Sequence, residues 1–474
     1  MVLMDSKTAG WNVFNGIVTG LLSFLLLPHF VFAAEKGNEG DDREHKGSGL
    51  ERGPDGLPRY EHRYSDGLYS TVTAINTFPD LVVQKEKKIK LKVPGFRKDV
   101  TVYSITQNSK APLVVCLMGV DGKVDGPWGC LFPYWYNEYN YNVLAFDSSF
   151  TPQYPEVNGQ GVVGNFDAET DQIAAIIKTY LDTGDNRNNI TEIGVIGYSF
   201  GATQALLLAA KGKEGKLPFE LSGCLALSPP IKLHTAARIM DRFYAEDRWK
   251  TTMIELAKRF GSHVPVKAGQ PIPFTATDMR GALGYAFRDG LSKVVERNDR
   301  FYKLKVIPSE DSGENRESYA DATGFQRYME LMVFPYWKKK GTVNSVEDLW
   351  AMADLTKILP RLPSYADAVV AANDPFNTPE DLDEAQAVDT NKRLTVLPTG
   401  GHLGFIAADW TLVKALRIFG KKVEPKEKPE VKDERSPDQA RIETRNDVRD
   451  AINRDVPPPD PDEKPRKKLF RTSQ

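Results

Sequence analysis

The feature that most constrains the fold is a series of short apolar runs, each ended by a turn residue and separated from the next by helical spacing or an insertion. Continuous apolar runs of this kind are typical of strands buried on both faces. Strands that alternate with helices predict a mostly parallel sheet with crossover helices, the α/β class. The runs are Pro112–Met118, Asn142–Phe146, Glu192–Ile196, Gly223–Leu227, Ala366–Ala372 and Leu394–Leu397.

Further elements are predicted beside these strands. Alternating apolar residues over Lys88–Val93 and Val100–Ile105 predict an antiparallel hairpin at the sheet edge. Helical spacing predicts helices that would flank the sheet over Phe166–Thr183, Gly201–Lys211 and Asp409–Phe419.

Between residues 231 and 357 the strand pattern stops. This segment has helical spacing, long polar stretches and aromatic clusters, without a clear buried strand. A chain of 474 residues is long enough for one large domain with insertions or for two domains. We predict an α/β core in two parts, residues 63–230 and 358–420, with a large helical cap insertion (231–357) over the carboxyl edge of the sheet.

The N-terminal residues carry a targeting signal. Gly16–Phe32 is mostly apolar, and no charged residue falls between Lys7 and Glu35. Val31-Phe32-Ala33 places small residues where signal peptidase recognises them. Residues 1–33 are therefore predicted to be a signal peptide, and the protein to be periplasmic or secreted. The alternative is an uncleaved segment that anchors the protein in a membrane, since its length is nearly enough to span a bilayer.

Two polar segments flank the predicted core. Residues 34–62 are rich in glycine and charged residues and are predicted to be a disordered linker. Residues 421–474 form a charged, Pro-rich tail that is predicted to be largely disordered. The net charge of −2 lacks the basic surplus of nucleic-acid-binding proteins, so nucleic acid is not an expected partner.

The chain has three cysteines, which allow one disulfide at most. Cys116 and Cys224 lie inside apolar runs, and Cys130 lies in a Gly/aromatic stretch. Because the count is not that of a disulfide scaffold, buried thiols are the prediction.

The motif Gly197-Tyr198-Ser199-Phe200-Gly201 follows a predicted buried strand and opens a predicted helix. This strand–turn–helix setting is that of a nucleophile elbow, in which the serine takes up strained backbone angles and its hydroxyl projects above the sheet. Glycines two residues before and after it let neighbouring backbone approach closely. Ser199 is the predicted nucleophile, although the same pattern can also form a structural turn.

A serine nucleophile needs a general base. Of the six histidines, only His402 follows a predicted core strand on a glycine-flanked loop, Gly400-Gly401-His402-Leu403-Gly404. A loop at the carboxyl edge of the sheet can bring this imidazole to the elbow, so His402 is the predicted base.

The base needs a carboxylate to orient it. Asp374, in Asn373-Asp374-Pro375, ends the preceding predicted strand and lies between the serine and the histidine in the chain. The order Ser, Asp, His favours Asp374 as the acid. The competing carboxylates more often face solvent or cap a helix; they are Asp367, Glu380, Asp381 and Asp383.

The oxyanion of an acyl-transfer reaction requires backbone N–H donors. One is predicted from Phe200, the residue after the nucleophile. The second is predicted from the loop Met118-Gly119-Val120-Asp121-Gly122, with Val120 as the candidate donor.

From about residue 63 to 420, leaving out the cap, the chain resembles the α/β-hydrolase superfamily. Its elbow, its Asn-Asp-Pro loop and its Gly-Gly-His-Leu-Gly-Phe loop are similar to those of YheT-like esterases. The resemblance implies the α/β-hydrolase fold and implies the roles given above for Ser199, Asp374, His402, Phe200 and Val120. In one departure, Met118-Gly119 stands where family members often have His-Gly, which bears on the oxyanion loop rather than on the three side chains.

The expected activity is hydrolysis of carboxylic esters by a carboxylesterase or lipase-like enzyme through an acyl-enzyme intermediate. The expected partner is a small-molecule or lipid-like acyl substrate. No cofactor or metal is expected, because neither metal-ligand spacing nor a phosphate-binding loop is found in the sequence. The alternatives are a peptidase, thioesterase or acyltransferase with the same triad, or a non-catalytic binding protein with a hydrolase fold.

Aromatic residues gather between residues 128 and 141. They either line an apolar acyl pocket or pack the first crossover helix against the core. The residues are Trp128, Phe132, Tyr134, Trp135, Tyr136, Tyr139 and Tyr141.

Overall fold

The computed structural model describes residues 52–53, 56–62, 64–74, 87–246, 275–308, 319–320 and 322–420. The predicted signal peptide (1–33), most of the predicted linker, part of the cap and the C-terminal tail lie outside these residues, and the first and last of these stay predictions. Within the described residues, no helix is both long enough and apolar enough to cross a bilayer.

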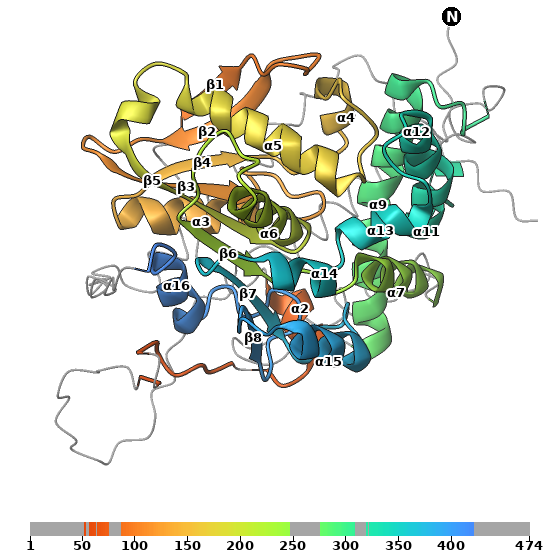
Figure 1. Cartoon of the computed structure of the whole chain (residues 1–474). Helices are drawn as coiled ribbons and strands as arrows, with labels where there is room; N and C mark the ends of the chain where they lie inside the picture. The colour runs from red at the N-terminus through yellow and green to blue at the C-terminus, as the bar shows by residue number, and fades with distance from the viewer. Residues whose placement is uncertain are drawn as a thin grey trace, which may run out of the picture. The chain divides into compact units, whose positions relative to one another are not determined.

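An eight-stranded sheet forms the centre of the fold, in the order β1-β2-β4-β3-β5-β6-β7-β8 (Figure 1). β1 pairs antiparallel with β2, and β2 with β4, whereas the other neighbouring strands are parallel. The predicted mostly parallel sheet with an antiparallel hairpin at one edge is therefore confirmed. The strands are β1 (Lys87–Leu91), β2 (Val100–Ile105), β3 (Ala111–Leu117), β4 (Asn142–Phe146), β5 (Ile190–Tyr198), β6 (Gly223–Leu227), β7 (Ala366–Ala371) and β8 (Leu394–Leu397).

Helices cover both faces of the sheet. On one face, α5 (Phe166–Leu181) and α6 (Phe200–Lys213) pack in the same hydrophobic cluster as Val115 and Leu117 of β3. On the other face, α3 (Pro127–Glu138) and α16 (Asp409–Leu416) pack with Val114 and Cys116. Side chains of one strand alternate between the two clusters because successive residues of a strand point to opposite faces.

The aromatic residues of α3 belong to the core packing. The Tyr136 hydroxyl donates to the carbonyl of Ala415 at 2.9 Å, and the Trp135 indole N–H donates to the carbonyl of Leu412 at 3.1 Å. Tyr141, just after the helix, donates in the same way to the carbonyl of Leu416. These side chains fix α3 against α16, so the packing interpretation holds for them and the acyl-pocket interpretation does not.

The described residues between β6 and β7 form helices joined by turns and loops and add no strand to the sheet, which confirms the predicted helical insertion. Figure 1 shows its helices, coloured green to teal, gathered largely at one end of the sheet. They are α7 (Leu233–Glu246), α9 (Ala276–Tyr302), α11 (Phe325–Tyr328), a π-helical turn (Met329–Val333), α12 (Phe334–Lys339), α13 (Val346–Met352) and α14 (Leu355–Ile358).

One carboxylate joins three of the cap helices. Asp241 of α7 accepts a hydrogen bond from the Arg288 guanidinium of α9 at 3.0 Å. It also accepts from the backbone N–H groups of Phe325 and Gln326, at 2.8 and 3.1 Å, and so caps the first turn of α11. The Arg288 side chain is only 7% exposed, so this ion pair is shielded from solvent and its loss would leave a buried charge.

A segment that precedes β1 packs against the loop that follows β8. Leu57 is 6% exposed, and the Tyr60 hydroxyl donates to the carbonyl of Thr399 at 2.7 Å. A short helix follows, α2 (Gly67–Thr73), with the Asp66 carboxylate capping its first turn. The sequence assigns residues 56–62 to a disordered linker, but this part of the chain packs against the core through Leu57 and Tyr60. The sequence gives no signal of this packing, because two isolated apolar side chains form no periodic pattern.

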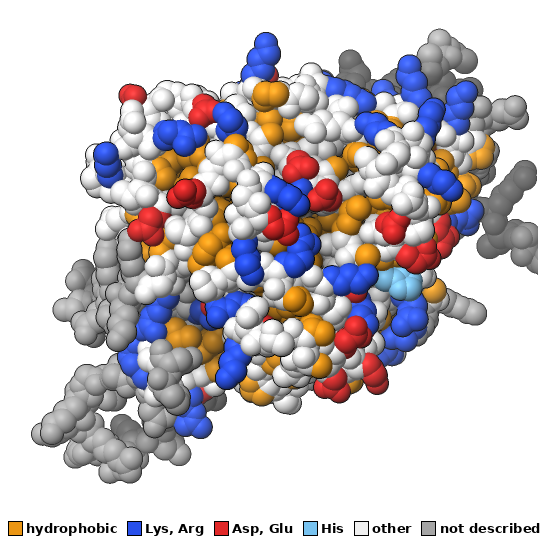
Figure 2. All heavy atoms as spheres, in the orientation of Figure 1, with side chains coloured by type: hydrophobic (Ala, Val, Ile, Leu, Met, Phe, Trp, Pro, Cys, Tyr) orange, Lys and Arg blue, Asp and Glu red, His pale blue; other side chains and the backbone are white. Residues whose placement is uncertain are grey.

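Acidic and basic side chains are intermixed on the face of the molecule shown in Figure 2. Ion pairs also join neighbouring helices. Lys211 of α6 pairs with Asp167 and Asp171 of α5, at 2.8 and 2.5 Å, and its own side chain is largely buried. These pairs fix the two helices that cover the same face of the sheet.

Replacing Asp241 with alanine is expected to lower the free energy of unfolding by about 3 kcal/mol, because it breaks a shielded ion pair with Arg288 and removes the acceptor of the Phe325 and Gln326 amides. Urea unfolding followed by tryptophan fluorescence measures the change. The control is Asp289→Ala, which breaks an exposed pair with Lys293 on α9 and should cost less than about 1 kcal/mol. Equal losses in the two variants would contradict the role given to Asp241.

Candidate active site

Ser199 occupies the sharp turn between β5 and α6. Its backbone angles, φ 56° and ψ −122°, are strained for a residue with a side chain. A Cβ on Gly197 would lie 2.2 Å from the carbonyl oxygen of Gly201, and one on Gly201 would lie 2.5 Å from that of Leu117. The strand–turn–helix prediction is therefore confirmed, and the two glycines are needed because backbone passes directly beside them.

Three side chains from three loops meet at this turn. His402 Nε2 lies 2.9 Å from Ser199 Oγ, and His402 Nδ1 lies 2.8 Å from Asp374 Oδ2. An ionised carboxylate only accepts hydrogen bonds, so Nδ1 carries the proton and Nε2 is left to accept from the serine hydroxyl. The Asp374 side chain is fully buried and that of His402 is 6% exposed, which shields their interaction from water. The arrangement is one in which His402 can remove the Ser199 proton.

The loop after β7 holds Asp374 in place. Asp374 Oδ1 accepts from the backbone N–H of Phe376 at 2.9 Å, and the Phe376 ring meets the His402 imidazole edge-on at 4.8 Å. Two competing carboxylates are engaged elsewhere. Asp367 pairs with Lys414 at 3.0 Å, and Asp381 pairs with Lys232 at 3.3 Å.

Side-chain oxygens fix the loop that carries His402. The backbone N–H of Gly401 donates to Asn373 Oδ1 at 2.9 Å, and that of Leu403 donates to Ser228 Oγ at 3.1 Å. The N–H of His402, between them, donates to Thr71 Oγ1 at 2.8 Å. Three successive amides are thus held by residues from three separate segments of the chain.

Sequence reasoning missed these anchors. Asn373 precedes Asp374 in the Asn-Asp-Pro motif, so its place beside the predicted acid is one sequence signal for a role at the site. Ser228 and Thr71 gave none, because each acts on a loop that is distant in sequence. Thr71 and His402 are 331 residues apart.

The two candidate oxyanion donors lie on either side of Ser199. Phe200 is the first residue of α6, and Val120 follows Gly119, where an added Cβ would lie 3.3 Å from Ser199 Cβ. Among the described residues, neither the Phe200 N–H nor the Val120 N–H donates to another backbone or side-chain group. Both amides are therefore free of an acceptor within the described residues, as an oxyanion donor requires.

Met118, the first residue of this loop, stands where α/β-hydrolases similar in these motifs often have histidine, and its side chain is buried. The Tyr198 hydroxyl donates to its sulfur. The start of the loop is thus held through the residue that precedes the nucleophile.

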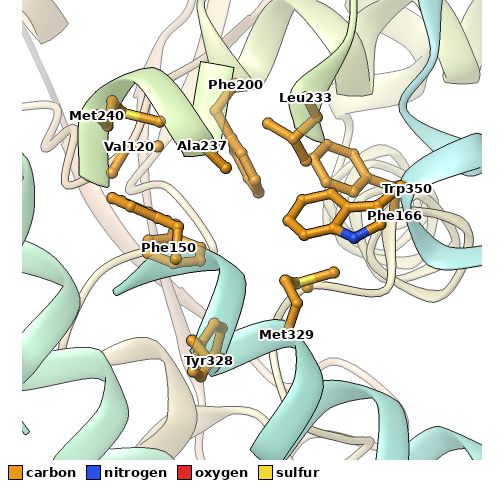
Figure 3. A pocket seen from close by; sticks show the side chains of 12 residues that line it. Val120, Phe150, Phe166, Phe200, Leu233, Ala237, Met240, Tyr328, Met329 and Trp350 are labelled. Carbon is orange, nitrogen blue, oxygen red and sulfur yellow. The ribbon is translucent and has the colours of Figure 1, made fainter. Parts of the chain in front are cut away.

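A small apolar cavity of about 30 Å³ lies between the sheet and the cap. Val120 and Phe200 line it from the core, and residues of α7, α11, the π-helical turn and α13 line it from the cap. Figure 3 shows their side chains pointing into the same space. The lining residues are Val120, Phe150, Gly164, Phe166, Phe200, Leu233, Ala237, Met240, Phe325, Tyr328, Met329 and Trp350.

A buried carboxyl group lies close to the core side of this cavity. Glu169 of α5 is 2% exposed and accepts from Ser149 Oγ at 2.6 Å and from the backbone N–H of Gly164 at 2.6 Å. Gln204 Nε2 donates to it at 2.9 Å. Burial raises the pKa of Glu169 from 4.5 to about 7, and these three hydrogen bonds oppose the rise.

Other histidines are placed away from the elbow. His62 Nε2 lies 3.0 Å from Ser70 Oγ, and His234 Nε2 lies 3.1 Å from Gln326 Nε2. His29, His45 and His263 lie outside the described residues. In the part of the chain that is described, no group of three or more His, Cys, Asp or Glu side chains is arranged to hold a metal ion.

Comparison with known proteins gives one family. The sequence profile described as "Alpha/beta hydrolase family" matches residues 125–412, more than half of the 474 residues. No curated protein matches the chain significantly.

Several solved structures are similar at low identity. An esterase from Pyrococcus furiosus is 14% identical, with 75% of this chain and 98% of that chain covered and a TM-score of 0.39. An alpha/beta hydrolase from Penicillium sp. sh18 is 13% identical, with 71% and 98% covered and a TM-score of 0.39. A thioesterase domain from the curacin biosynthetic pathway is 14% identical, with 71% and 100% covered and a TM-score of 0.35. These scores are low, so nothing about the activity of this chain follows from them.

The raised pKa of Glu169 predicts a pH-dependent stability. Between pH 4.5 and about 7 the folded protein keeps a proton that the unfolded chain releases, so stability falls as the pH rises through this range. A pKa change from 4.5 to about 7 corresponds to about 3 kcal/mol. Urea unfolding of the wild type and of Glu169→Gln at pH 5 and pH 8 measures how much Glu169 contributes to the free energy of unfolding at each pH.

The variant cannot ionise at this position, so its stability relative to the wild type should rise by about 3 kcal/mol between pH 5 and pH 8. Asp171→Asn, on the exposed side of the same helix, is the control and should show no such rise. A constant difference between wild type and Glu169→Gln at both pH values would contradict the prediction.

Proposed function

This chain belongs to the alpha/beta hydrolase family and has the α/β-hydrolase fold, and from that premise we propose that it is a serine hydrolase that cleaves carboxylic esters. The observation that carries the proposal is the continuous hydrogen-bonded line from Ser199 Oγ through the His402 imidazole to the Asp374 carboxylate. Its position at a strained strand–helix turn, beside two unused backbone amides, adds support.

The proposed reaction has two steps. Ser199 Oγ attacks the ester carbonyl while His402 Nε2 takes its proton, and the Asp374 carboxylate stabilises the imidazolium that forms. The N–H groups of Phe200 and Val120 bind the oxyanion. His402 then gives its proton to the leaving alkoxide, which leaves as an alcohol. A water molecule, deprotonated by His402, attacks the acyl-enzyme in the same way and releases the carboxylic acid and Ser199.

The apolar cavity supports an ester with an apolar acyl group. Two of its lining residues, Val120 and Phe200, are also the candidate oxyanion donors, so an acyl chain bound there would start beside the candidate oxyanion site. Ser199 itself does not line the cavity. Burial of methylene groups in such a cavity contributes about 0.8 kcal/mol each. The similarity of the acid and base loops to YheT-like esterases favours the same substrate class. Peptide and thioester substrates use the same triad and are separated from esters by a substrate screen.

Replacing Ser199 with alanine is expected to abolish labelling by a fluorophosphonate probe and to lower the hydrolysis of p-nitrophenyl butyrate by about 1,000-fold or more, because the nucleophile is removed. Gel fluorescence and absorbance assays measure the two effects. Ser222→Ala, which changes an exposed serine before β6, is the control and should label like the wild type. Unchanged labelling of Ser199→Ala, or a wild type that is not labelled, would overturn the proposal.

Replacing Ala237 with leucine is expected to shorten the acyl chain that is accepted. Ala237 lies on α7, is buried and lines the cavity, so a larger side chain there removes space for the substrate. The ratio of kcat/KM for the butanoyl ester to that for the acetyl ester should fall about 10-fold. Assays over p-nitrophenyl esters from two to ten carbons measure it.

The matched control is Ala236→Leu. This neighbour is equally buried on α7 but does not line the cavity, so it tests the general effect of adding volume to the helix. If both variants changed the chain-length profile alike, the cavity would not be the acyl site.

A further inference from the structure

Helix α2 lies in backbone contact with the loops that carry Asp374 and His402. A Cβ on Gly67 would lie 1.8 Å from the carbonyl oxygen of Asn373. A Cβ on Gly401, whose φ is 57°, would lie 2.2 Å from the carbonyl oxygen of Gly67. The glycine next to His402 therefore makes room for α2, and the base loop is packed against the helix.

The Thr71 hydroxyl joins α2 to the base loop. It donates to the carbonyl of Gly67 at 2.7 Å, one turn earlier in the same helix. That bond fixes the direction of its proton and leaves its lone pair to accept from the backbone N–H of His402 at 2.8 Å. Thr71 is 8% exposed and His402 is 6% exposed, so water has little access to this hydrogen bond.

Two further contacts hold the same region. Asn373 Nδ2 donates to the carbonyl of Ser65 at 2.7 Å, while Asn373 Oδ1 accepts from the Gly401 N–H. The Tyr60 hydroxyl donates to the carbonyl of Thr399, at the start of the base loop. Residues 60–62 and 64–71, which we call the N-terminal brace, thus contact both the acid loop and the base loop.

We propose that the N-terminal brace completes the active site, with Thr71 as a positioning residue that holds the backbone of His402. The effect on hydrolysis rests on the proposed function, because Thr71 acts only through the imidazole. His402 Nε2 lies 2.9 Å from Ser199 Oγ, and proton transfer between them depends on that distance. The brace precedes residues 125–412, so the part of the chain matched by the family profile depends on a segment outside it.

The test is Thr71→Val in the full chain, which keeps the side-chain shape and removes the hydroxyl. We expect kcat for p-nitrophenyl butyrate to fall about 10-fold or more, because small misplacements of a catalytic group are costly, while KM stays within about twofold. Thr71→Ser restores the hydroxyl and should recover most of kcat. The matched control is Thr179→Val on α5, which removes a threonine hydroxyl with the same bond to the carbonyl four residues earlier and should leave kcat unchanged.

Hydrogen exchange measured by mass spectrometry tests the brace without relying on activity. Peptides that cover residues 398–406 should exchange at least about 10-fold faster in Thr71→Val than in the wild type, because the His402 amide loses its acceptor. The same peptides should be unchanged in Thr179→Val. If the wild type hydrolyses no ester and yet this exchange difference appears, the proposed function is wrong, whereas the proposal that Thr71 holds the base loop is supported.

The proposal about the brace would be overturned if both kcat and hydrogen exchange were unchanged in Thr71→Val. A loss of kcat that Thr71→Ser does not recover would also overturn it. If Thr71→Val does not fold, exchange of the wild type in low urea decides. The peptides covering α2 and residues 398–406 should then open at the same urea concentration. Opening of α2 at lower urea, with the base loop still protected, would contradict the proposal.

Discussion

The site depends on the strained backbone of Ser199, which exists only because β3, β5 and α6 approach one another closely at the turn. Positive φ at a residue with a side chain is unfavourable by about 1–3 kcal/mol unless its surroundings determine it. Here they do, since Gly197 and Gly201 have no space for a Cβ and the Ser199 N–H donates to the carbonyl of Leu227. The hydroxyl is therefore presented above the carboxyl edge of the sheet, and partners must come from loops at that edge.

Parallel strands supply those loops, but they do not by themselves fix an imidazole to within a few tenths of an ångström. The base loop is fixed because three successive amides each donate to a side-chain oxygen, from Asn373, Thr71 and Ser228. Buried amides without acceptors are costly, so each of these bonds makes an alternative loop conformation unfavourable. A buried, immobile loop also lowers the local dielectric, which strengthens the pair between His402 and Asp374.

Much of the fold and the candidate triad could be predicted from the sequence, because both have local signals. Continuous apolar runs gave the strands, and Ser199, Asp374 and His402 each follow one of them in an order that suits acyl transfer. The brace could not be predicted. Its contacts join residues several hundred positions apart, and the sequence from Tyr60 to Thr71 shows no apolar periodicity that reveals a partner. The cap was predicted as helical, but which of its residues face the cavity depends on packing between helices.

Under the proposed function, chemistry and substrate binding belong to different segments of the chain. The three side chains of the candidate triad come from the core, and the brace holds one of them, whereas much of the cavity wall comes from α7, α11 and α13. Val120 and Phe200 belong to both, since they are the candidate oxyanion donors and their side chains line the cavity. If the cavity is the acyl site, a substitution in the cap changes which acyl groups fit without moving Ser199, as long as the Asp241–Arg288 pair keeps the cap helices together. The proposed role of the brace differs, since a change there would alter the rate of the chemical step for every substrate alike.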